Sequence, residues 1–78
     1  MRKFTFTALI WLADDVYVSK CPEIEVSSVG DTPDESLINL KEAIDLWLVN
    51  AEELGILEDY LPTITSSTKF TSSIEVEI

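Results

Sequence analysis

The sequence predicts a single small α+β domain over residues 1–78, with an antiparallel sheet packed against one long helix in the order β-β-β-α-β. Three observations lead to this fold class. Residues 3–21 hold two strand-like runs around a turn, residues 33–54 carry an apolar stripe at helical spacing, and residues 72–78 alternate apolar with acidic side chains. A chain of this length buries only about 60% of the surface that its unfolded form exposes, so we expect a partner or a second copy to add stability.

The first predicted strand spans residues 3–12 and is rich in aromatic and β-branched side chains. Alternation places two sets of residues on its opposite faces: Phe4, Phe6, Ala8, Ile10 and Leu12 on one, and Thr5, Thr7, Leu9 and Trp11 on the other. Because both faces become apolar towards the end, we expect this strand to be central or covered on both sides.

A hairpin and a third strand follow. Asp14 and Asp15 supply a turn, and residues 16–21 predict the second strand of the hairpin. Pro22 interrupts the ladder because proline has no backbone donor. Residues 25–30 then predict a third strand.

The helix predicted over residues 33–54 has signals at both ends. Thr32 is a good N-cap, Pro33 suits the first helical position, and Glu35 can reach back to the Thr32 amide to complete a capping box. Gly55 is placed to end the helix. The buried side is predicted by apolar residues at three- and four-residue steps: Leu37, Leu40, Ile44, Trp47, Leu48 and Ala51.

The C-terminal part predicts a connector and a final strand. Residues 56–69 contain a proline and a Ser/Thr cluster, which favours irregular structure. Residues 72–78 predict a strand with one solvated face, since apolar and acidic positions alternate: Ile74, Val76 and Ile78 against Glu75 and Glu77. A short strand after a long connector permits strand exchange or edge pairing between copies, so we expect a homodimer or a higher oligomer.

The side-chain chemistry predicts no enzyme. The chain has no histidine, and its one cysteine, Cys21, is expected to be a half-buried reduced thiol without a nearby base. A two-metal nuclease would need several carboxylates converging on the ions. The acidic pairs are expected on solvated turns and faces instead: Asp14 with Asp15, Glu23 with Glu25, and Glu75 with Glu77. We therefore predict no catalytic residue, no metal site and no cofactor.

Fifteen acidic side chains against five basic ones give a net charge of −10. Phosphate backbones repel such a chain, so we expect no direct binding of DNA or RNA. The same field would steer a basic protein towards it, although acidity alone also keeps a small apolar domain soluble. No apolar run approaches the roughly 20 residues that cross a bilayer, and the basic start has no small-residue cleavage site, so we expect no membrane association and a cytoplasmic protein.

An ordered series of short motifs runs through the first two thirds of the chain. In sequence order these are Tyr17-Val18, Cys21-Pro22-Glu23-Ile24, Ser27-Ser28-Val29, Gly30-Asp31-Thr32, Glu35-Ser36-Leu37 and Asn39-Leu40-Lys41-Glu42-Ala43-Ile44. Over residues 3–54, with a looser match at the last strand, the series resembles the core of the HicB family of antitoxins. The resemblance implies a partial ribonuclease-H-like fold and a partner of the HicA type, a small basic toxin that cleaves mRNA. It also implies a role: to bind that toxin and block it.

Two features depart from the family pattern. Asp14 and Asp15 stand where Gly-Gly or Asp-Gly is frequent in the first hairpin. Many family members also continue into a helix-turn-helix or ribbon-helix-helix domain, and the sequence up to Ile78 shows neither. The chain therefore resembles a short form of the family, and we expect no DNA binding.

The predicted helix also carries apolar residues on its outward side, where Ile38, Leu46 and Val49 occur among glutamates. Single apolar residues scattered on a surface are normal, but three on one half of a helix also suit contact with a partner or a second copy, with the outer side of the sheet as the other candidate surface. Trp11 is a further candidate because tryptophan is enriched at interface hot spots, the alternative being burial under the helix. The predicted partner-binding residues are Trp11, Ile38, Glu42, Leu46 and Val49.

These patterns favour an antitoxin that neutralises a HicA-like toxin by occluding its active surface. The second hypothesis is a stand-alone homo-oligomeric domain that binds a small molecule or an unrelated protein. An enzyme ranks third, because the sequence offers it no reactive constellation.

Overall fold

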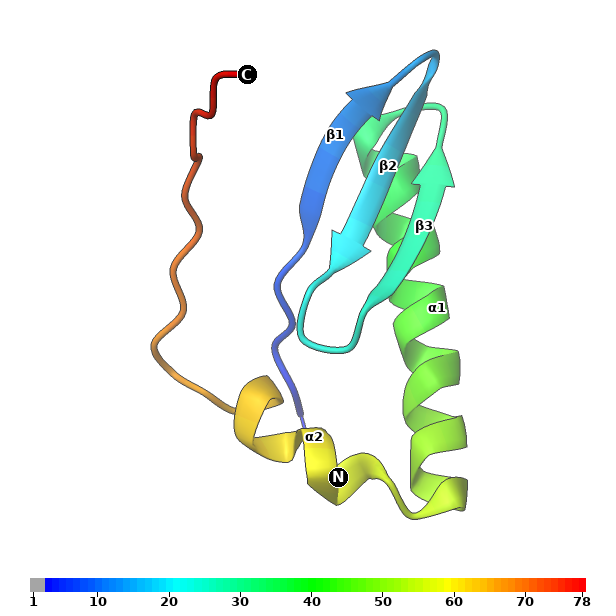
Figure 1. Cartoon of the computed structure of the whole chain (residues 1–78). Coiled ribbons are helices and arrows are strands. Elements are labelled where there is room, and N and C mark those ends of the chain that lie inside the picture. Colours follow the sequence, from blue (N-terminus) through cyan, green and yellow to red (C-terminus); the bar gives the residue numbers. More distant parts are fainter. Residues whose placement is uncertain (1–2) are drawn as a thin grey trace.

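Three antiparallel strands form the sheet in the computed structural model, which describes residues 3–78 (Figure 1). They are β1 (Leu9–Ala13), β2 (Val16–Cys21) and β3 (Val26–Gly30), in the order β1-β2-β3. Asp14 and Asp15 form the turn between β1 and β2, as predicted. Asp14 has a φ of 56°, a left-handed conformation that aspartate tolerates better than most residues.

Helix α1 (Pro33–Leu54) has the predicted span and covers one face of the sheet (Figure 1). The Thr32 hydroxyl accepts a hydrogen bond from the Glu35 backbone N–H at 3.0 Å, and Gly55 ends the helix with a φ of 73°. The Glu35 carboxylate accepts from the Asp31 N–H at 3.2 Å, not from the predicted Thr32 amide. The reach of Glu35 therefore extends one residue further back than in the predicted capping box.

Small residues let the first turns of α1 lie directly on the sheet. A Cβ added at Gly30 would meet the backbone nitrogen of Ser36, so this position of β3 requires glycine. The Ser36 carbonyl accepts a hydrogen bond from the Ser19 hydroxyl of β2 at 2.9 Å. Below this contact lies the buried core: Cys21, Ile24, Leu40, Ile44, Ala51, Leu57 and Ile64.

The first strand is shorter than predicted and lies at an edge of the sheet. Residues 3–8 form no ladder, and the backbone N–H and the hydroxyl of Thr7 donate to the Glu23 carboxylate at 3.0 and 2.6 Å. Pairing therefore begins only at Leu9. The prediction of a central or doubly covered strand is wrong, because β1 has a single neighbour and Leu12 is 59% exposed.

A second helix, α2 (Leu57–Ile64), forms where a connector was predicted. Its buried ends, Leu57 and Ile64, are seven residues apart and so lie on one side of a helix. Tyr60 packs edge-to-face on Trp47 of α1, with ring centroids 5.0 Å apart. Among residues 3–78, neither helix is long and apolar enough to span a membrane.

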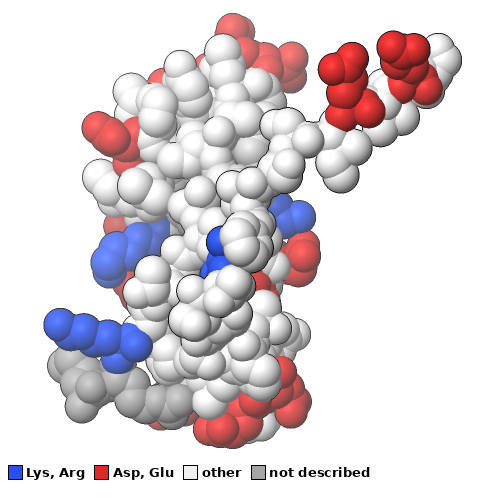
Figure 2. Space-filling view, turned by 90° about the vertical axis from the view of Figure 1, so that its left-hand side faces the viewer, with Lys and Arg blue, Asp and Glu red and all other residues white. Residues whose placement is uncertain are grey.

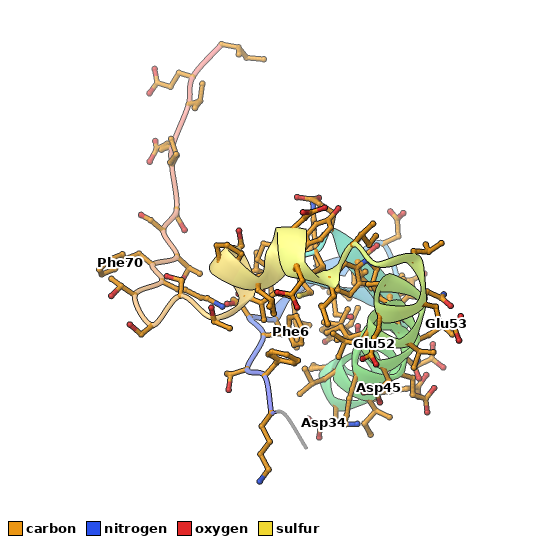
Figure 3. All side chains as sticks on the ribbon, turned by 90° about the horizontal axis from the view of Figure 1, so that it is seen from below. Phe6, Asp34, Asp45, Glu52, Glu53 and Phe70 are labelled. Atoms are coloured by element: carbon orange, nitrogen blue, oxygen red, sulfur yellow. The ribbon has the colours of Figure 1, made fainter. Side chains whose placement is uncertain are left out.

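The strand predicted at residues 72–78 is absent from the described chain. Residues 70–78, called the tail from here on, extend away from the body with every side chain exposed, and Phe70 points outward (Figures 1 and 3). A strand needs a neighbour for its backbone hydrogen bonds, and the three-stranded sheet includes no pairing with the tail. The order is therefore β-β-β-α-α, within the predicted α+β class.

Candidate protein-binding surfaces

The face of the sheet that points away from α1 is uncovered. Ser19 points towards α1, because its hydroxyl bonds to Ser36, so the adjacent Val18 points the other way, as does its cross-strand partner Trp11. The same alternation and register place Ala13 and five larger apolar side chains on this side. We call it the open face: Leu9, Trp11, Val16, Val18 and Val29.

The open face has an apolar centre and charged ends. Trp11 is 45% exposed and Val29 is 52% exposed. At one end Lys20 forms a salt bridge with Glu25 at 3.0 Å, and the Asp14–Asp15 turn lies at the other end. An apolar centre within a polar rim is the usual composition of a protein interface. Trp11 is not buried under the helix, so the alternative prediction for this residue is wrong.

A second surface lies on the outward side of α1. It consists of Ile38, Glu42, Leu46 and Val49, which we call the helix stripe. Steps of four, four and three residues keep these side chains on one side of the helix. Their exposure confirms that the three apolar members lie outside the core, at 60% for Ile38, 63% for Leu46 and 56% for Val49. Their role in binding stays a prediction.

The two surfaces face in opposite directions. Helix α1 covers the sheet face opposite to the open face, and acidic side chains of α1 project on its outer side (Figure 3). Trp11 is therefore separated from the other four predicted contact residues by the thickness of the molecule. A single flat partner cannot contact both surfaces at once.

An apolar groove opens between α1 and the N-terminal segment that precedes β1. Its volume is about 530 Å³, and its lining includes Phe4, Phe6, Ala8, Leu37, Ile38 and Ile44. Leu37 was predicted to lie in the core but is 44% exposed in this groove. The sheet ends at β1, so no further strand covers Leu37.

A buried carboxylate joins three distant parts of the chain. Glu23, in the turn between β2 and β3, accepts hydrogen bonds from Thr7 at 2.6 Å and from the Lys69 ammonium at 2.6 Å. The Cys21 thiol donates to the same carboxylate at 3.3 Å. The predicted solvated position of Glu23 is wrong, because only 8% of this residue is exposed.

These contacts shift the pKa of two groups. Burial alone would raise the pKa of Glu23, but the hydrogen bonds from Lys69, Thr7 and Cys21 outweigh burial and lower the pKa to about 2. Burial, followed by the hydrogen bond to Glu23, raises the pKa of the Cys21 thiol to about 11. Cys21 is fully buried rather than half-buried as predicted, and its thiol stays protonated at neutral pH. The cluster is thus suited to holding the N-terminal segment, the sheet and the chain after α2 together.

The described residues bring together no group of three or more His, Cys, Asp or Glu side chains that could hold a metal ion. Acidic side chains instead gather at the two ends of the body and on the tail, and lysine side chains lie among uncharged residues between them (Figure 2). The arrangement offers surfaces for contact with another macromolecule. No family model, curated protein or solved structure matches the chain.

Proposed function

We propose that this protein is an antitoxin of a type II toxin–antitoxin pair that binds a basic, HicA-like, mRNA-cleaving toxin through the open face. The observation that carries the proposal is the exposed apolar centre of that face. In an α+β fold, the sheet face that no helix covers normally carries polar side chains or packs against another layer. Here Trp11 and Val29 stand exposed instead.

Tryptophan supports the choice of the open face over the helix stripe. Binding energy concentrates on aromatic and arginine anchors near the centre of an interface. Trp11 lies opposite Val18 in the middle of the β1–β2 ladder, with charged groups only at the ends of the face. The helix stripe has no aromatic residue, and Glu42 interrupts it.

The net charge of −10 supports a basic partner. Complementary charge raises the rate of encounter and suppresses wrong partners more than it raises affinity. The Asp14–Asp15 turn beside the open face would meet Lys and Arg side chains at the rim. The resemblance of residues 3–54 to the HicB family gives this basic partner its proposed identity as an RNA-cleaving toxin.

The test is co-expression with the product of the neighbouring gene, which the proposal predicts to be a small basic protein. We expect the two proteins to co-purify, relief of the growth arrest that the partner causes alone, and loss of its RNA cleavage when the purified proteins are mixed. A wild-type chain that leaves the partner unbound and active would refute the proposal.

Two matched variants locate the contact. Trp11→Lys is expected to weaken partner binding at least about 100-fold, the scale of a hot-spot loss. Leu46→Lys, an apolar-to-basic change at a 63% exposed position on the helix stripe, is expected to bind like wild type. The reverse pattern would move the contact from the open face to the helix stripe. Circular dichroism of both variants checks that the fold is intact.

A further inference from the structure

The outer side of β1 is a free sheet edge. The strand order ends at β1, and residues 3–78 supply no strand beyond it. Proteins usually protect such an edge with charged side chains, proline or a covering segment. Residues 3–13 contain a single charged side chain, Lys3, and no proline. This edge is therefore open to pairing with another strand.

The tail has the pattern of a strand without a neighbour. Ile74 and Val76 alternate with glutamates, as on a strand with one apolar face. Both are nevertheless exposed, Ile74 at 86% and Val76 at 77%. The tail extends away from the body instead of folding onto it (Figure 1). Nine residues of extended chain reach about 30 Å, enough to follow the whole length of β1.

The groove lies where the side chains of an added strand would go. Ala8 and Phe6 share the α1-facing side of the N-terminal segment by alternation, and both line the groove. A strand that paired with β1 and continued beside residues 6–8 would point every second side chain into the same space. The apolar positions of the tail, Ile74, Val76 and Ile78, would then fill the groove and leave the glutamates in solvent.

The attachment of the tail argues against pairing with its own β1. Lys69 is held by Glu23, which also holds Thr7, so the tail starts beside the start of β1. Its own tail can only run parallel to β1, and it is too short to turn back. A parallel arrangement would bring Glu75 and Glu77 towards the Asp14–Asp15 turn, which like charges oppose.

A second copy can supply the antiparallel arrangement. In that direction the two glutamates lie towards Lys3 and away from the aspartate turn. Antiparallel pairing is also slightly more stable per residue than parallel pairing. We propose that the protein forms a symmetric dimer in which the tail of each copy adds antiparallel to β1 of the other and fills its groove with Ile74, Val76 and Ile78.

The first test measures mass without any partner protein. Light scattering after size exclusion, over about 1–100 µM, is expected to give a dimer for wild type. Val76→Asp is expected to raise the dimer dissociation constant at least about 10-fold, because it places a charge in the apolar groove. Ser73→Asp, with the same change of charge on the same segment, is expected to keep the wild-type constant within about threefold. A monomeric wild type, or equal effects of the two variants, would overturn the proposal.

The second test separates the two possible neighbours of the tail. In an antiparallel register that opposes Ile74 to Ile10, residue 76 lies across from Ala8. Two single variants, Ala8→Cys and Val76→Cys, are purified separately, mixed and oxidised; the native Cys21 is fully buried and does not compete. We expect a mixed disulfide that joins the two chains. A mixture that yields no such disulfide would show that the tail does not lie beside β1 of the other copy, and the proposal would be wrong.

Discussion

Glu23 joins parts of the chain that are far apart in the sequence. Its carboxylate is buried, yet hydrogen bonds from Thr7 and Lys69 keep it ionised. A buried charge is costly when one partner is removed, because the remaining charge has neither water nor a counter-ion. The pair therefore ties the chain after α2 to the sheet.

Replacing Lys69 by methionine is expected to lower the free energy of unfolding by about 2 kcal/mol at pH 7. This value lies below the usual range for a buried pair because the Lys69 side chain is 27% exposed. Urea unfolding at a fixed protein concentration measures it. Lys41→Met is the matched control, since Lys41 forms an exposed pair with Asp45, and its loss is expected to cost less than about 0.5 kcal/mol. Equal costs for the two variants would contradict the role of the Lys69–Glu23 pair.

The same pair predicts a pH dependence with a definite sign. The pKa of Glu23 is lowered from 4.5 to about 2 on folding, so its stabilising contribution is complete above pH 4.5 and is lost as the pH falls towards 2. The stability difference between wild type and Lys69→Met should therefore be constant from about pH 7 to pH 5 and shrink below that. A difference that grows on acidification would show that Glu23 is not the group responsible.

The position of Glu23 could not be predicted from local sequence. Its partner Lys69 is 46 residues away, and the surrounding Cys21-Pro22-Glu23 run also suits a solvated turn. The exposure of Ile38, Leu46 and Val49 could be predicted, because helical spacing alone separates them from the core stripe. The orientation of Trp11 needed the pairing of β1 with β2 as well.

At the scale of elements, the close packing of α1 against β3 depends on Gly30. Gly30→Ala is expected to cost about 3 kcal/mol, because the added methyl group meets the backbone of Ser36, which cannot move aside as a flexible side chain would. Gly55→Ala is the comparison, with free space around its Cβ but a φ of 73°, and is expected to cost about 1 kcal/mol. Thermal or urea unfolding of both variants shows which substitution lowers the stability more. A smaller cost at Gly30 than at Gly55 would contradict the close approach.

Elements with local signals were predictable, and elements that depend on distant contacts were not. Both ends of α1 follow from Thr32, Pro33 and Gly55 within its own sequence. Helix α2 is only eight residues long and contains Pro62, so its formation depends on packing against α1, as the contact of Tyr60 with Trp47 shows. The strand predicted at residues 72–78 is absent, because a strand requires a neighbour for its backbone hydrogen bonds and the described chain places none there.

At the scale of the whole molecule, net charge acts in opposite directions on the two proposed associations. Two copies that each carry −10 repel each other, whereas a basic partner is attracted. Raising the salt from about 0.01 M to about 0.15 M shortens the screening length from about 30 Å to about 8 Å. We expect this change to strengthen the dimer several-fold and to slow association with the basic partner at least about 10-fold.

Sedimentation equilibrium and stopped-flow mixing measure the two effects separately. The Val76→Asp variant serves as the control for stopped-flow mixing with the basic partner, because the salt dependence of that association rate should be the same as for wild type. If salt weakens the dimer, or leaves the encounter rate unchanged, charge does not act as described.

The fold, in which α1 covers only one face of the sheet, also places the two tryptophans in contrasting surroundings. Trp47 is partly enclosed between α1 and α2, and Trp11 stands on the open face. Intrinsic fluorescence therefore carries two separable signals: in a Trp11→Phe chain the emission reports folding alone, and in a Trp47→Phe chain it reports what covers the sheet. Binding at the open face and unfolding can thus be followed by fluorescence, without attaching a dye to the protein.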